Sequence, residues 1–136
     1  MDWFECNKKR IVKEVSIDEE LANSLINSSE KKNKSQEILP LNDTTSESKI
    51  SLAYDSLREL LEALSIKKGF KIYNHDCYTA FLKEILTESL MGDEFDEIRK
   101  IRNSINYHGK QITIEDCKNI LNQINALKTK VKRLLV

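Results

Sequence analysis

Two long stretches of this chain carry apolar residues at alternating steps of three and four, and this spacing constrains the fold more than any other feature. The first comprises Ile50, Ala53, Tyr54, Leu57, Leu61 and Leu64, and the second comprises Cys117, Ile120, Ile124, Leu127, Val131 and Leu134. Such spacing puts the side chains on one face of an α-helix, which is then buried against other helices. Only three glycines and one proline occur in 136 residues, so few positions interrupt these helices. The sequence therefore predicts an all-α protein.

We expect four long helices joined by short connections, packed as an antiparallel, up-and-down four-helix bundle with an extra N-terminal helical segment. The bundle core is assigned to residues 46–136, and residues 1–45 to N-terminal helices and a polar linker. Asp2 can cap a short helix that carries apolar residues as far as Val15. A longer helix is expected over residues 16–37, and the next from Ser46 or Ser48 to Lys68, closed by Gly69.

The second half of the chain contains three further helix signals. A helix is expected to begin at Asn74 or His75 and to be broken near Gly92. Asp93 is then expected to cap the following helix, and Thr113 the last one, which reaches the C-terminus. No segment of the chain has the alternating pattern of a strand, so no β-structure is expected.

Charge and cysteine content indicate a soluble cytoplasmic protein. Acidic and basic residues balance at 22 each, so any anion-binding site must be local. Cys6, Cys77 and Cys117 are widely spaced and odd in number, which favours reduced thiols. The N-terminus is too polar for a signal peptide, and no apolar run approaches the ~20 residues of a membrane helix.

Most familiar catalytic motifs are missing. The sequence has no glycine-rich phosphate loop, no Cys-x-x-Cys pair and no His-Glu-x-x-His, and we expect no metal and no cofactor. His75 and Cys77 are too close along a helix start to face each other, so Cys77 is a poor nucleophile candidate. Glu59 and Glu62 lack the histidine of a di-metal site.

The remaining candidate is the stretch from Arg99 to Gly109. Arg102 lies beside an apolar helix face formed by Phe95, Ile98, Ile101 and Ile105, and His108 precedes a glycine suited to a helix C-cap. A guanidinium that binds phosphate and an imidazole that titrates near neutrality are sufficient to cleave RNA without a metal. On one straight helix, however, Arg102 and His108 would differ by about 240° in direction and ~9 Å in height.

A purely structural interpretation of these residues also exists. Arg102 could pair with Asp55, Glu59 or Glu62 on the second bundle helix, and His108 could cap its own helix. Both interpretations are open at the level of sequence.

The chain resembles HEPN domains (higher eukaryotes and prokaryotes nucleotide-binding). The resemblance covers about residues 48–135 and rests on Arg102-Asn103-x-x-x-x-His108, which matches the family's Arg-polar-x(n)-His signature. It is strengthened by Ala53-Tyr54-Asp55-x-x-Arg58, Lys68-Gly69-Phe70-Lys71 and Asn74-His75 at the corresponding places.

The resemblance implies a helical bundle that forms a homodimer, with the two signatures meeting across a cleft. It implies a metal-independent endoribonuclease of the toxin or defence type, with Arg102 and His108 as the catalytic pair and Asn103 orienting them. The family also implies an alternative, a non-catalytic module that binds a nucleotide or docks a partner. The implied partners are RNA or a nucleotide phosphate, and a cognate antitoxin or nucleotidyltransferase.

Other residues near the signature are expected to bind substrate or to support the pair. They are Tyr107, Asn106, Tyr54, Glu62 and His75. Members paired with a nucleotidyltransferase often carry His-x-Tyr, but Lys110 occupies that tyrosine position here, so regulation through a modified tyrosine is not expected.

Overall fold

A computed structural model describes residues 1–109 and 111–136, with the side chains of Tyr107 and His108 outside the description. The protein is mostly helical, with 74% of the chain in helices, which confirms the predicted helical class. Four long helices make up most of it: α2 (Glu19–Ile38), α3 (Ser46–Lys67), α5 (Ser89–His108) and α6 (Ile114–Leu135). None of the helices described has both the length and the apolar character needed to cross a lipid bilayer.

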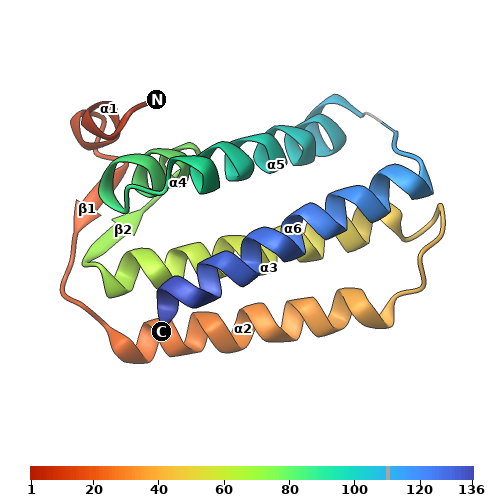
Figure 1. Ribbon diagram of the computed structural model, residues 1–136, viewed down its shortest axis with the longest axis horizontal. Helices are drawn as coiled ribbons and strands as arrows, with labels where there is room; N and C mark the ends of the chain where they lie inside the picture. The colour runs from red at the N-terminus through yellow and green to blue at the C-terminus, as the bar shows by residue number, and fades with distance from the viewer. Residues whose placement is uncertain (110) are drawn as a thin grey trace.

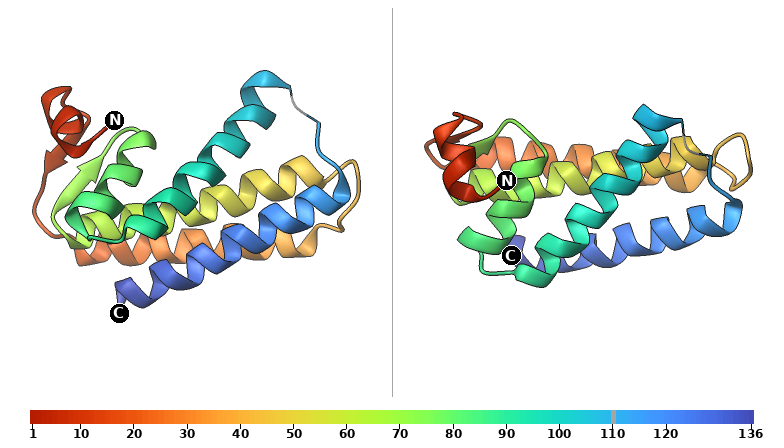
Figure 2. Two further views of the ribbon diagram at one scale, coloured as in Figure 1. Left: turned by 45° about the horizontal axis from the view of Figure 1, so that its top comes forward. Right: turned by 90° about the horizontal axis from the view of Figure 1, so that it is seen from above.

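Helix α3 forms the centre of the molecule because the others pack around it (Figure 1). Its apolar seam is buried as predicted, and Tyr54, Leu57, Leu61 and Leu64 have no solvent exposure. Helix α2 runs along one side, where Ser29 Oγ lies 2.8 Å from Ser56 Oγ. Helix α6 packs on another side, whereas α5 crosses obliquely and diverges toward its C-terminal end (Figure 2).

Capping residues explain where the long helices begin and end. Asp18 accepts a hydrogen bond from the Leu21 N–H at 3.0 Å, so α2 starts at Glu19 rather than at residue 16. The ammonium group of Lys49, itself buried, donates to the carbonyls of Gln36 and Leu39 at 2.5 and 2.7 Å, which satisfies the end of α2. Thr113 caps α6 as predicted, because its hydroxyl accepts from the Asp116 N–H.

The prediction that the chain contains no strand is wrong. Strand β1 (Val12–Glu14) pairs antiparallel with β2 (Phe70–Ile72), with Val12 opposite Ile72. The N-terminal helix α1 (Trp3–Lys8) therefore ends well before Val15. Arg10 adopts a left-handed backbone with φ of 58° just before β1, and Gly69 has φ of 87° just before β2. The left-handed backbone at Arg10 and Gly69 interrupts the helical conformation before each strand. The two strands then lie side by side.

The segment after β2 also differs from the prediction. It contains a short helix α4 (Asp76–Ala80) that continues as a single π-helical turn, η1 (Phe81–Ile85), and α5 then starts at Ser89. Gly92 therefore lies inside α5 and does not interrupt a helix, and Asp93 also lies inside α5 instead of capping it. A Cβ at Gly92 would lie 2.5 Å from Lys83 Cγ and 3.2 Å from the Thr79 carbonyl oxygen. The glycine is thus required by close helix packing rather than by a helix end.

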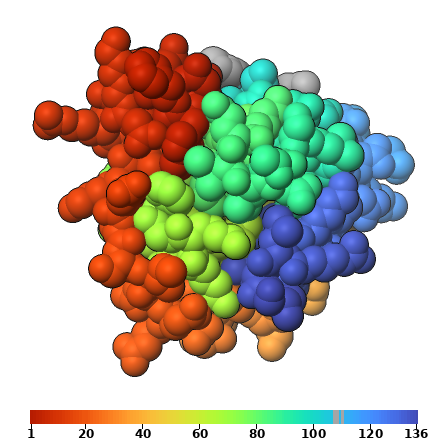
Figure 3. Space-filling model, turned by 60° about the vertical axis from the view of Figure 1, so that its left-hand side comes forward, coloured from red at the N-terminus to blue at the C-terminus, as the bar shows by residue number. Residues whose placement is uncertain are grey.

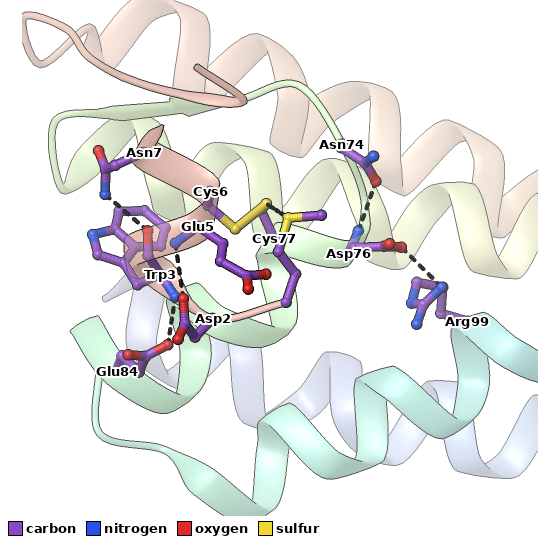
Figure 4. The surroundings of a disulfide bond; sticks show 11 residues. Asp2, Trp3, Glu5, Cys6, Asn7, Asn74, Asp76, Cys77, Glu84 and Arg99 are labelled. Carbon is purple, nitrogen blue, oxygen red and sulfur yellow. Dashed lines mark hydrogen bonds and ion pairs between the residues drawn. A yellow bond between two sulfur atoms is a disulfide. The ribbon is translucent and has the colours of Figure 1, made fainter. Parts of the chain in front are cut away.

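A disulfide bond corrects the prediction of reduced thiols. Cys6 in α1 and Cys77 in α4 are bonded, with Cα atoms 6.1 Å apart, while Cys117 is free and buried. Both bonded cysteines have no solvent exposure (Figure 4). The two cysteines are 71 positions apart in the sequence, so their spacing could not reveal the pair. They come together because β1 and β2, which lie between them in the sequence, pair with each other.

The N-terminal segment is firmly packed against the region around α4 (Figure 3). The Trp3 ring lies edge-on to Phe70, with centroids 5.3 Å apart, and 6.0 Å from Phe81. The backbone N–H of Trp3 donates a hydrogen bond to the Glu84 carboxylate at 2.7 Å. Its neighbour Phe4 is instead 72% exposed. Residues 1–14 are therefore tied to the same end of the molecule that holds the start of α4.

Candidate functional site

Helix α5 presents Arg102 beside a buried apolar face. Phe95, Ile98 and Ile105 are buried and Ile101 is half-buried, as the helical spacing predicts. The helix ends at Gly109, whose φ of 62° is the left-handed C-cap conformation expected there. This face fixes the rotation of α5 about its axis, and so sets the direction in which Arg102 leaves it.

Arg102 and the following Asn103 line an open cavity of about 290 Å³ between α5 and the connection from β2 to α4. The complete lining consists of Tyr73, Asn74, His75, Asp76, Arg99, Arg102 and Asn103. We refer to this cavity as the arginine pocket. Two guanidinium groups, two amides, an imidazole and a phenol supply hydrogen-bond donors, and the lining carboxylate of Asp76 is paired with Arg99. This set of donors suits an anion.

The wall of the arginine pocket is built on Tyr54 of α3. The Tyr54 hydroxyl lies 3.0 Å from His75 Nδ1, and the Arg102 guanidinium carbon lies 5.0 Å from the centroid of the Tyr54 ring. Burial raises the pKa of Tyr54 to about 12, so its hydroxyl keeps its proton at neutral pH. A buried tyrosine thus orients the imidazole through its hydroxyl and the guanidinium through its ring face.

Two arginines and two aspartates, Arg58, Arg102, Asp55 and Asp76, surround His75. Burial lowers the pKa of the His75 imidazole, and the nearby guanidinium groups of Arg58 and Arg102 lower it further. The imidazole is therefore neutral at pH 7, with one ring nitrogen able to donate and the other to accept. A neutral histidine beside Arg102 can contact an anion as a hydrogen-bond donor without adding a further positive charge.

The lowered pKa of His75 makes stability depend on pH in a defined direction. Below pH ~6.5 the unfolded chain binds a proton at His75 that the folded protein binds only at lower pH, so folding is disfavoured as the pH falls. We expect urea denaturation to show wild type losing more stability than His75→Gln between pH 7.5 and pH 5. Equal losses in the two proteins would contradict the burial of His75 described above.

Arg99 closes one side of the pocket and is held by two carboxylates. Its terminal nitrogens lie 2.9 Å from Asp76 and 2.7 Å from Asp96, and Figure 4 shows the first of these pairs. Among the described residues, its buried Nε has no hydrogen-bond partner. Arg99 thus links α5 to the start of α4, the helix that the disulfide attaches to α1.

The sequence-predicted site residues fall into three groups. Arg102, Asn103 and His75 line the arginine pocket, and Tyr54 supports it. Asn106 is exposed and Glu62 pairs with Arg58 at 3.2 Å, and neither lines the pocket. The predicted roles of His108 and Tyr107 concern side chains outside the described part of the structure. The regulatory argument from Lys110 likewise falls on a residue that is not described.

Two of the three acidic partners considered for Arg102 form ion pairs with other residues. Glu59 forms an ion pair with Lys32 of α2, and Glu62 forms one with Arg58 on α3 itself. One contact of Arg102 is with the Tyr54 ring.

Sequence reasoning missed Tyr73, Asn74, Asp76 and Arg99 as pocket residues. Tyr73 directly follows β2, and the strand pairing that orients it was not predicted. Arg99 begins the candidate stretch but was not assigned a role, and no local pattern relates it to Asp76, which lies 23 residues earlier.

Comparison with known proteins adds no assignment, because the chain matches no family model, no curated protein and no solved structure at a significant level.

Proposed function

We propose that this protein is a HEPN-like four-helix-bundle endoribonuclease that works as a homodimer without a metal and uses the arginine pocket to hold the scissile phosphate of RNA. The alternative in which the same pocket only binds a nucleotide phosphate is an outcome of the test below. The proposal assigns Arg102, Asn103 and His108 to the reacting phosphate, in line with the signature that they form.

One observation carries the proposal: Arg102 opens into the same cavity as Asn103, Arg99 and His75. A planar guanidinium can donate two parallel hydrogen bonds to a phosphate, and Arg102 is held in place by the face of Tyr54. Arg99 lies at the rim, where the carboxylates of Asp76 and Asp96 balance its charge. The pocket therefore combines an ordered phosphate donor with neutral polar groups suited to a ribose or a base.

The proposed chemistry follows from these groups. The ribose 2′-oxygen attacks phosphorus, the bond from phosphorus to the 5′-oxygen breaks, and the products are a 2′,3′-cyclic phosphate and a 5′-hydroxyl. The proton leaves the 2′-hydroxyl and a proton reaches the 5′-oxygen, with His108 serving as the acid or the base. Arg102 stabilises the negative charge on the pentacoordinate phosphate.

The test is cleavage of a mixed-sequence RNA oligonucleotide in EDTA. Wild type is expected to release fragments with cyclic phosphate ends, and to leave the same sequence intact when every 2′-hydroxyl is methylated. His108→Ala is expected to lose cleavage while it still binds the methylated RNA. Binding of methylated RNA by wild type with no cleavage of the unmodified strand identifies a binding module and refutes the enzyme.

The proposed composite site between two chains is tested separately, by mixing two inactive variants and measuring RNA cleavage. Since Arg102 and His108 cannot share one face of a straight helix, the two inactive variants Arg102→Ala and His108→Ala are mixed. A mixed dimer with one intact composite site restores part of the activity. If the mixture stays as inactive as its components, the site does not combine residues of two chains.

A further inference from the structure

Tyr73 is an exposed aromatic residue at the rim of the arginine pocket, and the proposed phosphate chemistry does not use it. Its side chain is 58% exposed although it belongs to the same cavity lining as Arg102 and Asn103. A single exposed ring needs no explanation by itself, but this ring lies at the rim of a cavity that also holds two arginines and two amides. The question is therefore what a ring at this rim would bind.

The backbone at Tyr73 is fixed, so the ring is presented from a rigid support. The Tyr73 N–H donates to the Ile11 carbonyl at 2.8 Å, which extends the β1–β2 pairing by one residue beyond Ile72. The next residue, Asn74, accepts from the Asp76 N–H at 3.0 Å and forms the turn that leads into α4. The ring is thus held between the sheet and the pocket instead of on a loose loop.

A positive charge lies beside the same ring. The Lys71 ammonium nitrogen lies over the Tyr73 ring, 5.5 Å from its centroid, and Arg99 and Arg102 line the cavity at whose rim this ring lies. Proteins that hold single nucleotides or single strands combine an aromatic platform for the base with cations for the adjoining phosphates. A cavity of about 290 Å³ has room for one nucleotide unit rather than an extended ligand.

We propose that Tyr73 is the platform of a base-binding subsite, on which the base attached to the phosphate held by Arg102 stacks. This inference rests on the proposed function, because it takes the phosphate to lie at Arg102. It assigns the base-stacking role to Tyr73, a residue that the sequence analysis did not include among the expected site residues. The lining amides of Asn74 and Asn103 then lie where they can contact the edge of the base or its ribose.

The test compares adenosine 5′-monophosphate with ribose 5-phosphate, which has the same phosphate and no base. Stacking of one base on an aromatic side chain predicts that Tyr73→Ala weakens binding of the nucleotide by about 5-fold to 150-fold. Tyr73→Phe keeps the ring and is expected to bind within about two-fold of wild type. Ribose 5-phosphate is expected to bind all three proteins equally. Adenine proton resonances are expected to shift upfield with wild type and with Tyr73→Phe only.

The outcomes separate this inference from the proposed function. If Tyr73→Ala binds the nucleotide as well as wild type while Arg102→Ala loses both ligands, the phosphate site stands and the base subsite is refuted. If Arg102→Ala binds both ligands normally, or if wild type binds neither, the phosphate site fails and the subsite fails with it.

Discussion

Replacing Arg102 with alanine is expected to lower the rate of RNA cleavage by at least 100-fold while the protein stays folded. Loss of one preorganised donor to a developing negative charge typically costs 10² to 10³ in rate. The contact of the guanidinium with the Tyr54 ring contributes about 1 kcal/mol to stability, and its loss is measured separately from the loss of rate. Rates are measured in single-turnover assays with labelled RNA, and folding is checked by urea denaturation of the same samples.

Two matched variants give this prediction its specificity. Arg102→Lys keeps the charge and loses the planar fork, so we expect a rate between those of wild type and Arg102→Ala. Arg133→Ala removes an exposed arginine from the last turn of α6 and is expected to cleave like wild type. If Arg133→Ala is as slow as Arg102→Ala, the loss reflects net charge and Arg102 has no special place in the site.

The second large effect is expected from the Cys6–Cys77 disulfide. The bond closes a loop across a sequence separation of 71 residues, and the chain-entropy estimate for such a loop is about 4 kcal/mol. Cys6→Ala together with Cys77→Ala is therefore expected to lower the free energy of unfolding by several kcal/mol in urea denaturation. Alanine is preferred to serine because both sites are fully buried and a serine hydroxyl would need a partner.

Trp3 reports on the same change, because it is the one tryptophan of the chain and packs against Phe70 and Phe81. If the disulfide holds α1 in place, the double variant shows Trp3 fluorescence shifted to the red below the unfolding transition. Cys117→Ala is the matched control, since it removes a buried thiol that is not bonded. A double variant with the urea midpoint of wild type would show that the other packing of residues 1–14 suffices.

The long helices were predictable because their signals are local. The seam of α3 and the Thr113 cap of α6 each depend on residues within one or two turns, and the structure has both. Gly69 and Gly92 show where prediction from local sequence signals fails. Gly69 ends a helix by its own left-handed backbone, whereas Gly92 is needed because Lys83 and Thr79 approach it from another segment. The sequence around a glycine does not distinguish these two reasons.

Contacts between segments far apart in the sequence also explain why some residues of the arginine pocket were not predicted. Arg102 and Asn103 were found from a helix face and a signature, but their pocket is completed by Tyr73 and Asp76 on a different segment. That segment takes its place through the β1–β2 pairing and the Cys6–Cys77 bond. Both depend on residues more than 50 positions apart, which no local pattern relates.

The central claim is that RNA phosphate binds in the arginine pocket, and it is tested most directly by mapping where RNA binds. Protein labelled with ¹⁵N is titrated with a short 2′-O-methyl RNA, which cannot be cleaved, while backbone amide shifts are followed. We expect the largest shifts at residues 73–76 and 102–103, and their loss in Arg102→Ala. Shifts confined to other surfaces, such as the basic last turn of α6, or no shifts at all, would contradict the claim.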